Sequence, residues 1–345
     1  MNSTMKPNLF GMDLQELKDV VKQHGFPTFT AKQMVDWLYK KRCNTIDEMT
    51  NLSLKVREQL KENYVLEKHA PITSQTSVDG TKKYLFQVDD TNYIESVYIP
   101  DRDRATLCIS SQKGCKMGCK FCVTGKQGFK GHLTTAEIVN QVFMIPESLN
   151  LTNIVYMGMG EPFDNLEAVV KSINILTSEW GVAMSPRRIT VSTVGIIPGI
   201  REFMERTECH LAVSLHAPYG DTRMSIMPMQ KPYPHTEIIR LLKKYDWSGQ
   251  RRLSFEYIVF KGLNDDEQSI RKLVDILKHL RCRVNLIRFH SSEGVALEGV
   301  DDKRMIEIRD YLDAEGIICT IRASRGIDIM AACGLLAGKK KEDNC

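Results

Sequence analysis

Long apolar runs are missing from this sequence of 345 residues, since none approaches the roughly 18 residues that a transmembrane helix needs. The first residues, MNSTMKPNLFGMDLQELKD, carry no apolar core of a signal peptide. A large excess of either charge is also missing, because 47 Lys and Arg residues balance 43 Asp and Glu residues. We therefore expect a cytoplasmic protein with no membrane span. Its net charge of +4 allows a nucleic-acid partner without requiring one.

Several common catalytic motifs are absent. The segment GMGEP at 158–162 is not a dinucleotide-binding fingerprint, because Phe163 occupies the place of the third glycine. His216 is not accompanied by a G-x-S-x-G elbow, which argues against Ser-His nucleophilic catalysis. No internal repeat or low-complexity tract occurs. These absences leave the cysteines as the strongest chemical signal.

The sequence contains ten cysteines, and 42% of its residues are hydrophobic. A chain of this size and composition folds around a core of its own without needing disulfides. Thiols stay reduced in the compartment that we expect, so any disulfide would be transient and catalytic.

The stretch from Cys108 to Phe129 carries the densest group of these cysteines. Cys115, Cys119 and Cys122 form a C-x3-C-x2-C triplet, which brings three thiolates to one face of a compact cluster. A structural zinc normally has four protein ligands in paired units, and no second pair follows at such spacing. Buried packing thiols are the remaining alternative. We favour a [4Fe-4S] cluster with one iron left open for a ligand.

The N-terminal part reads as helical. Apolar residues recur at helical spacing between residues 9 and 65, with Asp13 and Thr30 as expected N-caps. We expect a helical accessory domain at 1–65 that binds RNA, although its basic edge is equally compatible with an ordinary solvated face. Short alternating runs then predict a β-hairpin linker at 66–104.

The rest of the chain alternates strand-like apolar runs with helical segments, which predicts parallel strands joined by crossover helices in an α/β fold. A barrel and a doubly wound sheet both fit this rhythm. Polar or glycine-rich residues end nearly every expected strand, and barrels place their active sites at that rim, so we favour a barrel at 105–338. The lysine-rich residues 339–345 are expected to form a disordered tail.

Some of these strand-end residues are candidate ligand-binding groups. Glu161 follows two glycines and could hold an ammonium group, while Ser192, Ser214, His216 and Asn285 could contact a ribose or a carboxylate. Strand-end capping is the alternative role for each. Cys333, in DIMAACGLL, is expected just after a strand and near a helix start, where a thiol tends towards the thiolate form.

The motifs CISSQKGCKMGCKFCVTGKQGF, GMGEP, SPRRITVSTVGIIP, SLHAP, VNLI and RGIDIMAACG occur in this order. In this respect the sequence resembles the RlmN/Cfr family of radical S-adenosylmethionine (SAM) enzymes. The resemblance implies a partial (β/α)6 TIM-like barrel. The residues that match its SAM-contacting positions are Gly160, Glu161, Ser192, Ser214, Leu215, His216 and Asn285, and those that match its cluster ligands are Cys115, Cys119 and Cys122.

The resemblance also implies a reaction. Carbon 2 of an adenosine, at position 2503 of 23S rRNA and position 37 of tRNA, would be methylated with two SAM molecules per turnover. Cys333 matches the cysteine that carries the methyl group, Cys108 the cysteine that forms a transient disulfide with it, and Glu95 the proton acceptor. An electron donor such as flavodoxin would reduce the cluster, and the enzyme is expected to be a monomer.

Two alternatives stay open at this point. A Cfr-type enzyme would methylate carbon 8 of the same rRNA adenosine with the same cysteines, and only Pro162 favours the carbon-2 enzyme. A non-catalytic RNA-binding protein with a structural metal belongs to a different class. The sequence also departs from the family pattern at Val123, Met330 and Leu335, and in the segment FHSSEGVALEG at 289–299.

Overall fold

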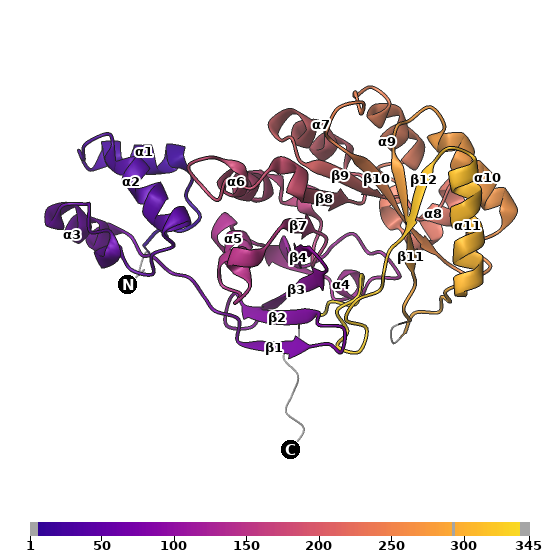
Figure 1. Ribbon diagram of the computed structural model, residues 1–345, viewed down its shortest axis with the longest axis horizontal. Helices are drawn as coiled ribbons and strands as arrows, with labels where there is room; N and C mark the ends of the chain where they lie inside the picture. The colour runs from indigo at the N-terminus through magenta and orange to yellow at the C-terminus, as the bar shows by residue number, and fades with distance from the viewer. Residues whose placement is uncertain (1–5, 292–293, 339–345) are drawn as a thin grey trace, which may run out of the picture.

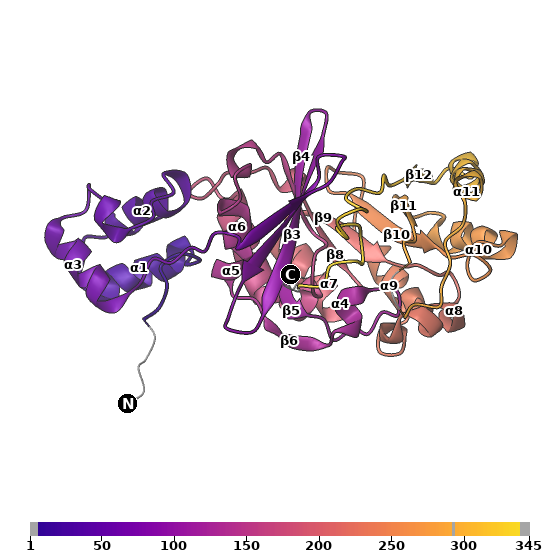
Figure 2. The same ribbon diagram turned by 90° about the horizontal axis from the view of Figure 1, so that it is seen from below.

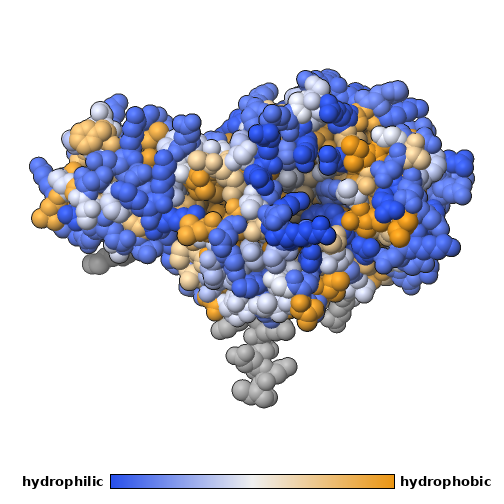
Figure 3. Space-filling view, viewed as in Figure 1, coloured by the Kyte–Doolittle hydropathy of each residue, from blue (hydrophilic) through white to orange (hydrophobic). Residues whose placement is uncertain are grey.

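The computed structural model describes residues 6–291 and 294–338, so the expected tail at 339–345 lies outside the described residues. A small helical lobe from the N-terminus stands beside a larger α/β body (Figure 1). A second view places this lobe and helices α10 and α11 at opposite ends of the long axis (Figure 2). Hydrophilic residues cover most of the face in Figure 3, with apolar patches where the two lobes meet. In the described part of the chain, no helix is long and apolar enough to cross a membrane.

The N-terminal lobe has the predicted helical character. Its elements are α1 (Leu14–Gln23), α2 (Thr30–Val35), a π-helical turn (Asp36–Lys40), a 3-10 turn (Ile46–Glu48) and α3 (Leu54–Asn63). Asp13 caps α1 as predicted, through a capping box in which Asp13 and Glu16 each accept a hydrogen bond from the other's backbone N–H. The predicted Thr30 cap is wrong. Phe29 already has helical backbone angles, so Thr30 is the first helical residue and no side chain caps α2.

The body is built on one ten-stranded sheet with the order β1-β2-β3-β4-β7-β8-β9-β10-β11-β12. The strands are β1 (Thr73–Thr76), β2 (Lys82–Gln87), β3 (Tyr93–Asp101), β4 (Arg104–Cys108), β7 (Asn153–Tyr156), β8 (Ile189–Thr193), β9 (His210–Ser214), β10 (Leu253–Val259), β11 (Arg283–Arg288) and β12 (Ile318–Ile321). Pairing is antiparallel from β1 to β4 and parallel from β4 to β12. The expected hairpin thus continues the edge of the main sheet, and the predicted partial α/β barrel is confirmed.

Helices connect the parallel strands on the outside of the sheet. They are α5 (Thr135–Phe143), α6 (Leu166–Thr177), α7 (Ile197–Arg206), α8 (Gly220–Ile226), α9 (His235–Leu242), α10 (Glu267–Leu277) and α11 (Asp302–Ala314). Shorter 3-10 turns lie at Ser148–Asn150, Pro162–Asp164, Pro186–Arg188 and Pro228–Gln230. The helices bury one apolar face each, as Val169, Ile173 and Leu176 of α6 do. Because parallel strands all end at the same rim, this arrangement gathers the polar strand ends together.

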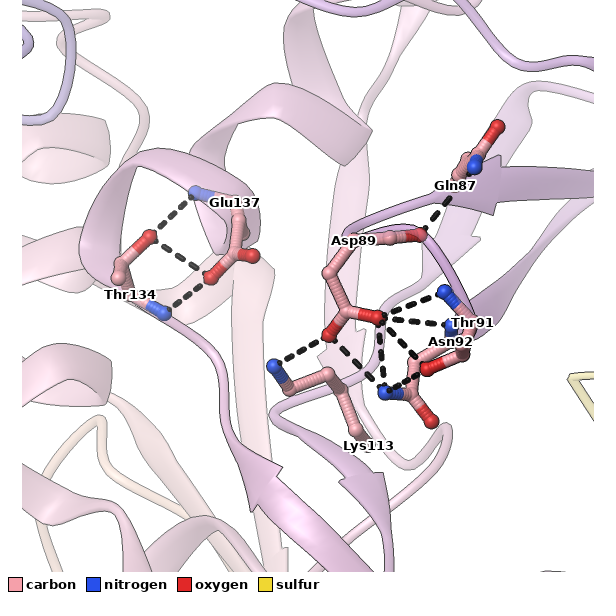
Figure 4. Close-up of polar contacts among 7 residues, drawn as sticks. All are labelled: Gln87, Asp89, Thr91, Asn92, Lys113, Thr134 and Glu137. Carbon is pink, nitrogen blue, oxygen red and sulfur yellow. Dashed lines mark hydrogen bonds and ion pairs between the residues drawn. The ribbon is translucent and has the colours of Figure 1, made fainter. Parts of the chain in front are cut away.

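A second, two-stranded sheet frames the cysteine loop. It consists of β5 (Gln112–Gly114) and β6 (Phe129–His132), with the short helix α4 (Val123–Lys126) between them. Asp89 ties this unit to the turn between β2 and β3 (Figure 4), since its carboxylate accepts hydrogen bonds from the backbone of that turn and pairs with Lys113 at 2.9 Å. The hydrogen bond from Lys113 holds the pKa of Asp89 well below its usual value. Figure 4 also shows the capping box of Thr134 and Glu137 that begins α5.

Candidate active site

One cavity at the C-terminal rim of the parallel strands collects most of the predicted site residues. It is lined by the cysteine loop, by the GMGEP segment after β7, and by the ends of β8 and β9. The predicted site residues in its wall are Cys115, Cys119, Cys122, Gly160, Glu161, Ser192, Ser214, His216 and Cys333. We call this space the main cavity.

The three clustered cysteines lie in one wall of the main cavity. Burial raises the pKa of each thiol, to about 12 for Cys115, and a bound metal centre would stabilise the thiolates. Within the described ranges, no group of three or more His, Cys, Asp or Glu residues is placed to hold a single metal ion. In a cubane each thiolate binds a different iron, and three thiols that share one cavity wall suit such a cluster.

The loop after β7 brings its backbone close to the cysteine loop. Gly160 has a positive φ of 98°, and a Cβ there would lie 2.5 Å from the Cβ of Gln112, so only glycine fits. Glu161 is buried, and its carboxylate accepts backbone hydrogen bonds from Phe163 at 3.0 Å and Val194 at 2.8 Å. Burial raises the pKa of Glu161 to about 7. A carboxylate in this position suits a cationic ligand group such as an ammonium.

His216 follows β9 and faces the main cavity. Its Nδ1 accepts a hydrogen bond of 3.0 Å from the backbone N–H of Ile258, which leaves the proton on Nε2. Burial, and then the nearby Arg223, lower the pKa of His216 to about 3. The ring also packs edge-on against Phe121, with centroids 4.9 Å apart. His216 is therefore a neutral, fixed donor and no candidate for a general acid at neutral pH.

Two of the predicted SAM-contacting residues do not line the main cavity. Leu215 is buried, and its carbonyl oxygen accepts a hydrogen bond from Nε of Arg223 at 3.1 Å. The amide of Asn285 donates to Glu256 at 2.7 Å, and its oxygen accepts from the hydroxyl of Thr320 at 2.6 Å. Glu256 does line the cavity, so Asn285 acts on this site by orienting Glu256.

Cys333 lies at the junction of three cavities. It lines the main cavity, a wide cavity with several arginines, and a small cavity that also contains Cys108. The predicted helix start at Cys333 is wrong, because no helix occurs in the described residues after β12. The thiol is exposed, as expected from its small neighbours.

Cys108 ends β4 and is buried. The fold brings it to the same small cavity as Cys333, across 225 positions of sequence. Burial and the neighbouring Cys333 raise the pKa of the Cys108 thiol to about 12, and the positive charge of Arg322 opposes this effect. Arg322 lines all three cavities that meet at Cys333.

Glu95 is buried in β3, and the sequence pattern does not predict its contacts. Its carboxylate accepts hydrogen bonds from the backbone N–H groups of Ala337 at 2.7 Å and Gly338 at 3.1 Å, and it pairs with Lys83 at 3.2 Å. It does not line the three cavities around Cys333. In this structure Glu95 therefore anchors the segment that follows Cys333.

Several residues of the site were not predicted from the sequence. Arg223 is completely buried and donates to the carbonyl oxygens of Val194, Ser214 and Leu215, so it fixes the ends of β8 and β9. Arg322 contacts Glu256 at 3.4 Å. The position of Arg322 directly after a strand was an available signal, whereas nothing local to the sequence marks Arg223 as buried.

Comparisons with known proteins show which family the chain belongs to. Residues 7–66 match the ribosomal RNA large subunit methyltransferase N-terminal domain, and residues 109–274 match the radical SAM superfamily. A probable dual-specificity RNA methyltransferase RlmN from Bacteroides thetaiotaomicron is 58% identical over 336 residues, which cover 97% of each chain. The chain belongs to the RlmN family. It is accordingly a radical SAM RNA methyltransferase, a transferase whose superfamily uses SAM and a [4Fe-4S] cluster.

Two further proteins extend this result. The dual-specificity RNA methyltransferase RlmN of Aliarcobacter butzleri is 40% identical over 357 residues, covering 98% of both chains. The crystal structure of a radical SAM methyltransferase from Sphaerobacter thermophilus superposes with a TM-score of 0.89 at 38% identity, over 96% of this chain and all of that one. The relatives from Bacteroides thetaiotaomicron and Aliarcobacter butzleri are both named RlmN, and this does not favour the Cfr-type alternative.

Proposed function

We propose that this chain methylates carbon 2 of adenosine at position 2503 of 23S rRNA and at position 37 of tRNA. Membership of the RlmN family supports the substrate class. The observation that carries the proposal is the position of Cys333, which lines both the main cavity and the small cavity that contains Cys108. Carbon 2 of adenine is electron-poor, so its methylation requires a carrier and radical chemistry in place of simple displacement.

The main cavity supplies residues for both cofactors in this proposal. Cys115, Cys119 and Cys122 would hold the [4Fe-4S] cluster, and the carboxylate of Glu161 would bind the ammonium group of SAM. Gly160, Ser192, Ser214 and His216 would contact the rest of the molecule, with Leu215 and Asn285 supporting them. When bound, the reduced cluster and SAM would supply the radical chemistry, and a separate SAM molecule would supply the methyl group.

Cys333 is the methyl carrier in this scheme. Its thiolate sulfur attacks the sulfonium methyl group, so that an S–CH3 bond forms on Cys333 as the bond to the SAM sulfur breaks. The exposure of Cys333 and its place beside the proposed SAM residues support this role. After one hydrogen atom is removed from that methyl group, the carbon radical on the Cys333 sulfur would bond to carbon 2 of the adenosine and tether the RNA to the protein, and the adduct would give up one electron, which the oxidised iron-sulfur centre would accept.

Cys108 and Glu95 would release the product. Glu95 accepts the proton that leaves carbon 2, and the Cys108 thiolate attacks the Cys333 sulfur. An S–S bond forms, the C–S bond breaks, and the released carbon takes up a proton to become the methyl group. Since Glu95 now accepts hydrogen bonds from Ala337 and Gly338, its use as a base requires that this end of the chain shift. A reductant then restores both thiols.

The cavity that Cys333 shares with Arg104, Arg288 and Arg325 is a suitable entry for RNA. Its wall contains the arginines Arg104, Arg288 and Arg325, together with the carboxylate of Asp101 and the thiol of Cys333. Positive side chains of this kind bind phosphate groups. We further propose that the enzyme acts as a monomer and receives electrons from a protein such as flavodoxin.

The test is methylation of 23S rRNA and tRNA by the anaerobically reconstituted enzyme, followed by mass spectrometry of the digested nucleosides. We expect 2-methyladenosine from both RNAs and no product from the Cys333→Ala variant. A product that is 8-methyladenosine would instead assign the Cfr-type reaction, and methylation of only one RNA would refute the dual specificity.

A further inference from the structure

A second basic cavity lies at the opposite end of the barrel from the main cavity. Five arginines line it, and we call it the arginine cavity: Arg187, Arg251, Arg252, Arg281 and Arg283. Its volume is about 310 Å³, and the remaining wall includes Trp247 and the start of β12. The arginines come from segments directly before or at the beginning of β8, β10 and β11. This is the N-terminal rim of the strands. The length of β10 places this rim about 20 Å from the C-terminal rim.

Three of these arginines are not engaged by the protein. Within residues 6–291 and 294–338, the side chains of Arg187, Arg252 and Arg283 make no hydrogen bond or ion pair. Among the same residues, no carboxylate lines the cavity. The acidic groups that influence its arginines are Glu208, beside Arg251, and Asp246, beside Arg281.

The other two arginines are fixed in place. Arg251 donates to the carbonyl oxygens of Cys209 at 2.9 Å and Met204 at 3.1 Å and to the hydroxyl of Thr207 at 3.2 Å. Arg281 donates to the carbonyl oxygen of Ser248 at 3.0 Å. The cavity therefore combines a rigid, positively charged floor with three cations that are available to bind a ligand.

His210, at the start of β9, reports the same concentration of positive charge. Burial, and then the nearby Arg252, Arg251, Arg283 and Arg187, lower its pKa to about 4. Its Nδ1 accepts a hydrogen bond of 3.0 Å from the backbone N–H of Arg252, so the ring is neutral. Like charges at close range repel, and a bound anion would offset this repulsion.

We propose that the arginine cavity is a phosphate-binding site, whose ligand is the phosphodiester backbone of the RNA substrate at a point remote from the target adenosine. Guanidinium groups bind phosphate oxygens in pairs of parallel hydrogen bonds, and three available ones in a cavity can hold more than one phosphate. The assignment to RNA rests on the proposed function. A free nucleotide or inorganic phosphate offers the same chemistry and is the other source that the experiment must distinguish.

The experiment uses the variant Arg187→Gln/Arg252→Gln/Arg283→Gln in the full-length, cluster-loaded enzyme. The matched control is Arg201→Gln/Arg240→Gln/Arg271→Gln, which removes the same charge from exposed positions on α7, α9 and α10. Binding of a long 23S rRNA transcript and of an anticodon stem-loop is measured over a range of salt concentrations. Thermal stabilisation by inorganic phosphate and by ATP is measured in parallel.

We expect the cavity variant to bind the long transcript about tenfold or more weakly than the control does. The slope of its salt dependence should be shallower by about 0.7–0.9 for each phosphate group that the variant no longer binds. Its affinity for the stem-loop should equal that of the control. A loss of stabilisation by phosphate and ATP with unchanged RNA binding would assign the site to a free phosphate compound. Equal binding of all probes by the variant and the control would overturn the site.

Methylation of the stem-loop separates this inference from the proposed function. If the wild-type enzyme methylates no RNA while phosphate or ATP binding still depends on the three arginines, the proposed function fails and the anion site stands. If methylation proceeds but no probe distinguishes the two triple variants, the site fails alone. Single substitutions of each arginine give the same readout in smaller steps should the triple variant be poorly folded.

Discussion

The hydroxyl of Thr124 donates a hydrogen bond of 2.7 Å to the carbonyl oxygen of Leu336. Thr124 lies in α4, two residues after Cys122, and Leu336 lies three residues after Cys333. The adjacent backbone N–H of Val123 donates to the carbonyl oxygen of Gly334 at 2.8 Å. The loop that carries the three clustered cysteines therefore holds the segment after the proposed methyl carrier, at Gly334 and Leu336.

The first prediction concerns this hydrogen bond. Thr124→Val keeps the side-chain volume but leaves the buried carbonyl oxygen of Leu336 without its partner, which costs about 1–3 kcal/mol. We expect RNA methylation to fall several-fold while the iron content and the visible absorption of the reconstituted cluster stay unchanged. Thr124→Ser, which keeps the donor, is the control. Full activity in the valine variant would show that the hydrogen bond does not position Cys333.

The second prediction separates two roles of Glu95. Glu95→Gln keeps an oxygen that accepts from Ala337 and Gly338 but removes the base, so RNA should accumulate as a covalent adduct of Cys333. Glu95→Ala removes the anchor as well, and its free energy of unfolding should be lower by about 1–3 kcal/mol. Denaturing gels with labelled RNA and chemical denaturation measure the two effects. Release of free methylated RNA by the glutamine variant at the wild-type rate would leave Glu95 with the anchoring role alone.

The third prediction concerns the two reactive cysteines. Mass spectrometry of peptides from active enzyme should find a methyl group on Cys333. The Cys108→Ala variant should trap RNA on Cys333, because no thiol can displace it. Free, fully methylated RNA from this variant would rule out the resolving role of Cys108.

The fourth prediction is that Arg322 assists the ionisation of Cys108. Burial raises the pKa of that thiol to about 12, and Arg322 is the cation that opposes the shift. In Arg322→Gln the thiolate should be scarcer, so trapped RNA should accumulate at neutral pH and decline as the pH is raised. Arg322→Lys, which keeps the charge, should restore release. A pH-independent loss of activity in both variants would indicate a structural role only.

The fifth prediction follows from Glu161. Its pKa is raised to about 7 by burial, so the free site is partly protonated at neutral pH. Because the ammonium of SAM favours the ionised carboxylate, binding should release a proton, and affinity should rise as the pH increases from about 6 to 8. Calorimetry in buffers of different ionisation enthalpy measures this. The Glu161→Gln variant should bind SAM weakly at every pH. If the affinity of this variant for SAM depends on pH as that of the wild type does, the released proton comes from another group.

The Glu161 carboxyl group also makes the free energy of unfolding depend on pH. This free energy should fall as the pH rises, whereas the affinity for SAM should increase. The folded protein binds the Glu161 proton more tightly than the unfolded chain does. Its contribution to the free energy of unfolding is therefore present below the ordinary glutamate pKa and is lost as the pH rises through about 7. A bound cation should offset this loss.

Local sequence patterns predicted much of the fold. The alternation of strands and helices indicated the partial barrel, and the capping residue Asp13 was found where helix periodicity placed it. Thr30 failed as a cap because Phe29 had already adopted helical angles, which depends on the preceding turn and not on the residue type. The helix expected near Cys333 failed because small residues after a strand fit a loop as well as a helix start.

The site depended more strongly on tertiary structure. The clustered cysteines are close in sequence, so their spacing alone predicted a shared cavity. Leu215 and Asn285 match motif positions, yet their roles as partners of Arg223 and Glu256 depend on side-chain directions that spacing does not define. Arg322 and Glu95 contact segments far along the chain, and such contacts leave no periodic trace in sequence.

The position of Cys333 between cavities has a kinetic consequence. Cys333 lines both the main cavity and the cavity that contains Arg104, Arg288 and Arg325. Cys333 would therefore be able to receive its methyl group before any RNA is present. The enzyme would then follow a double-displacement order, in which protein already methylated on Cys333 binds RNA as its second substrate. When RNA is limiting, protein methylated on Cys333 would accumulate as the resting state. In the first turnover after RNA is added, the carbon transferred to the RNA would come from the methyl group already on Cys333.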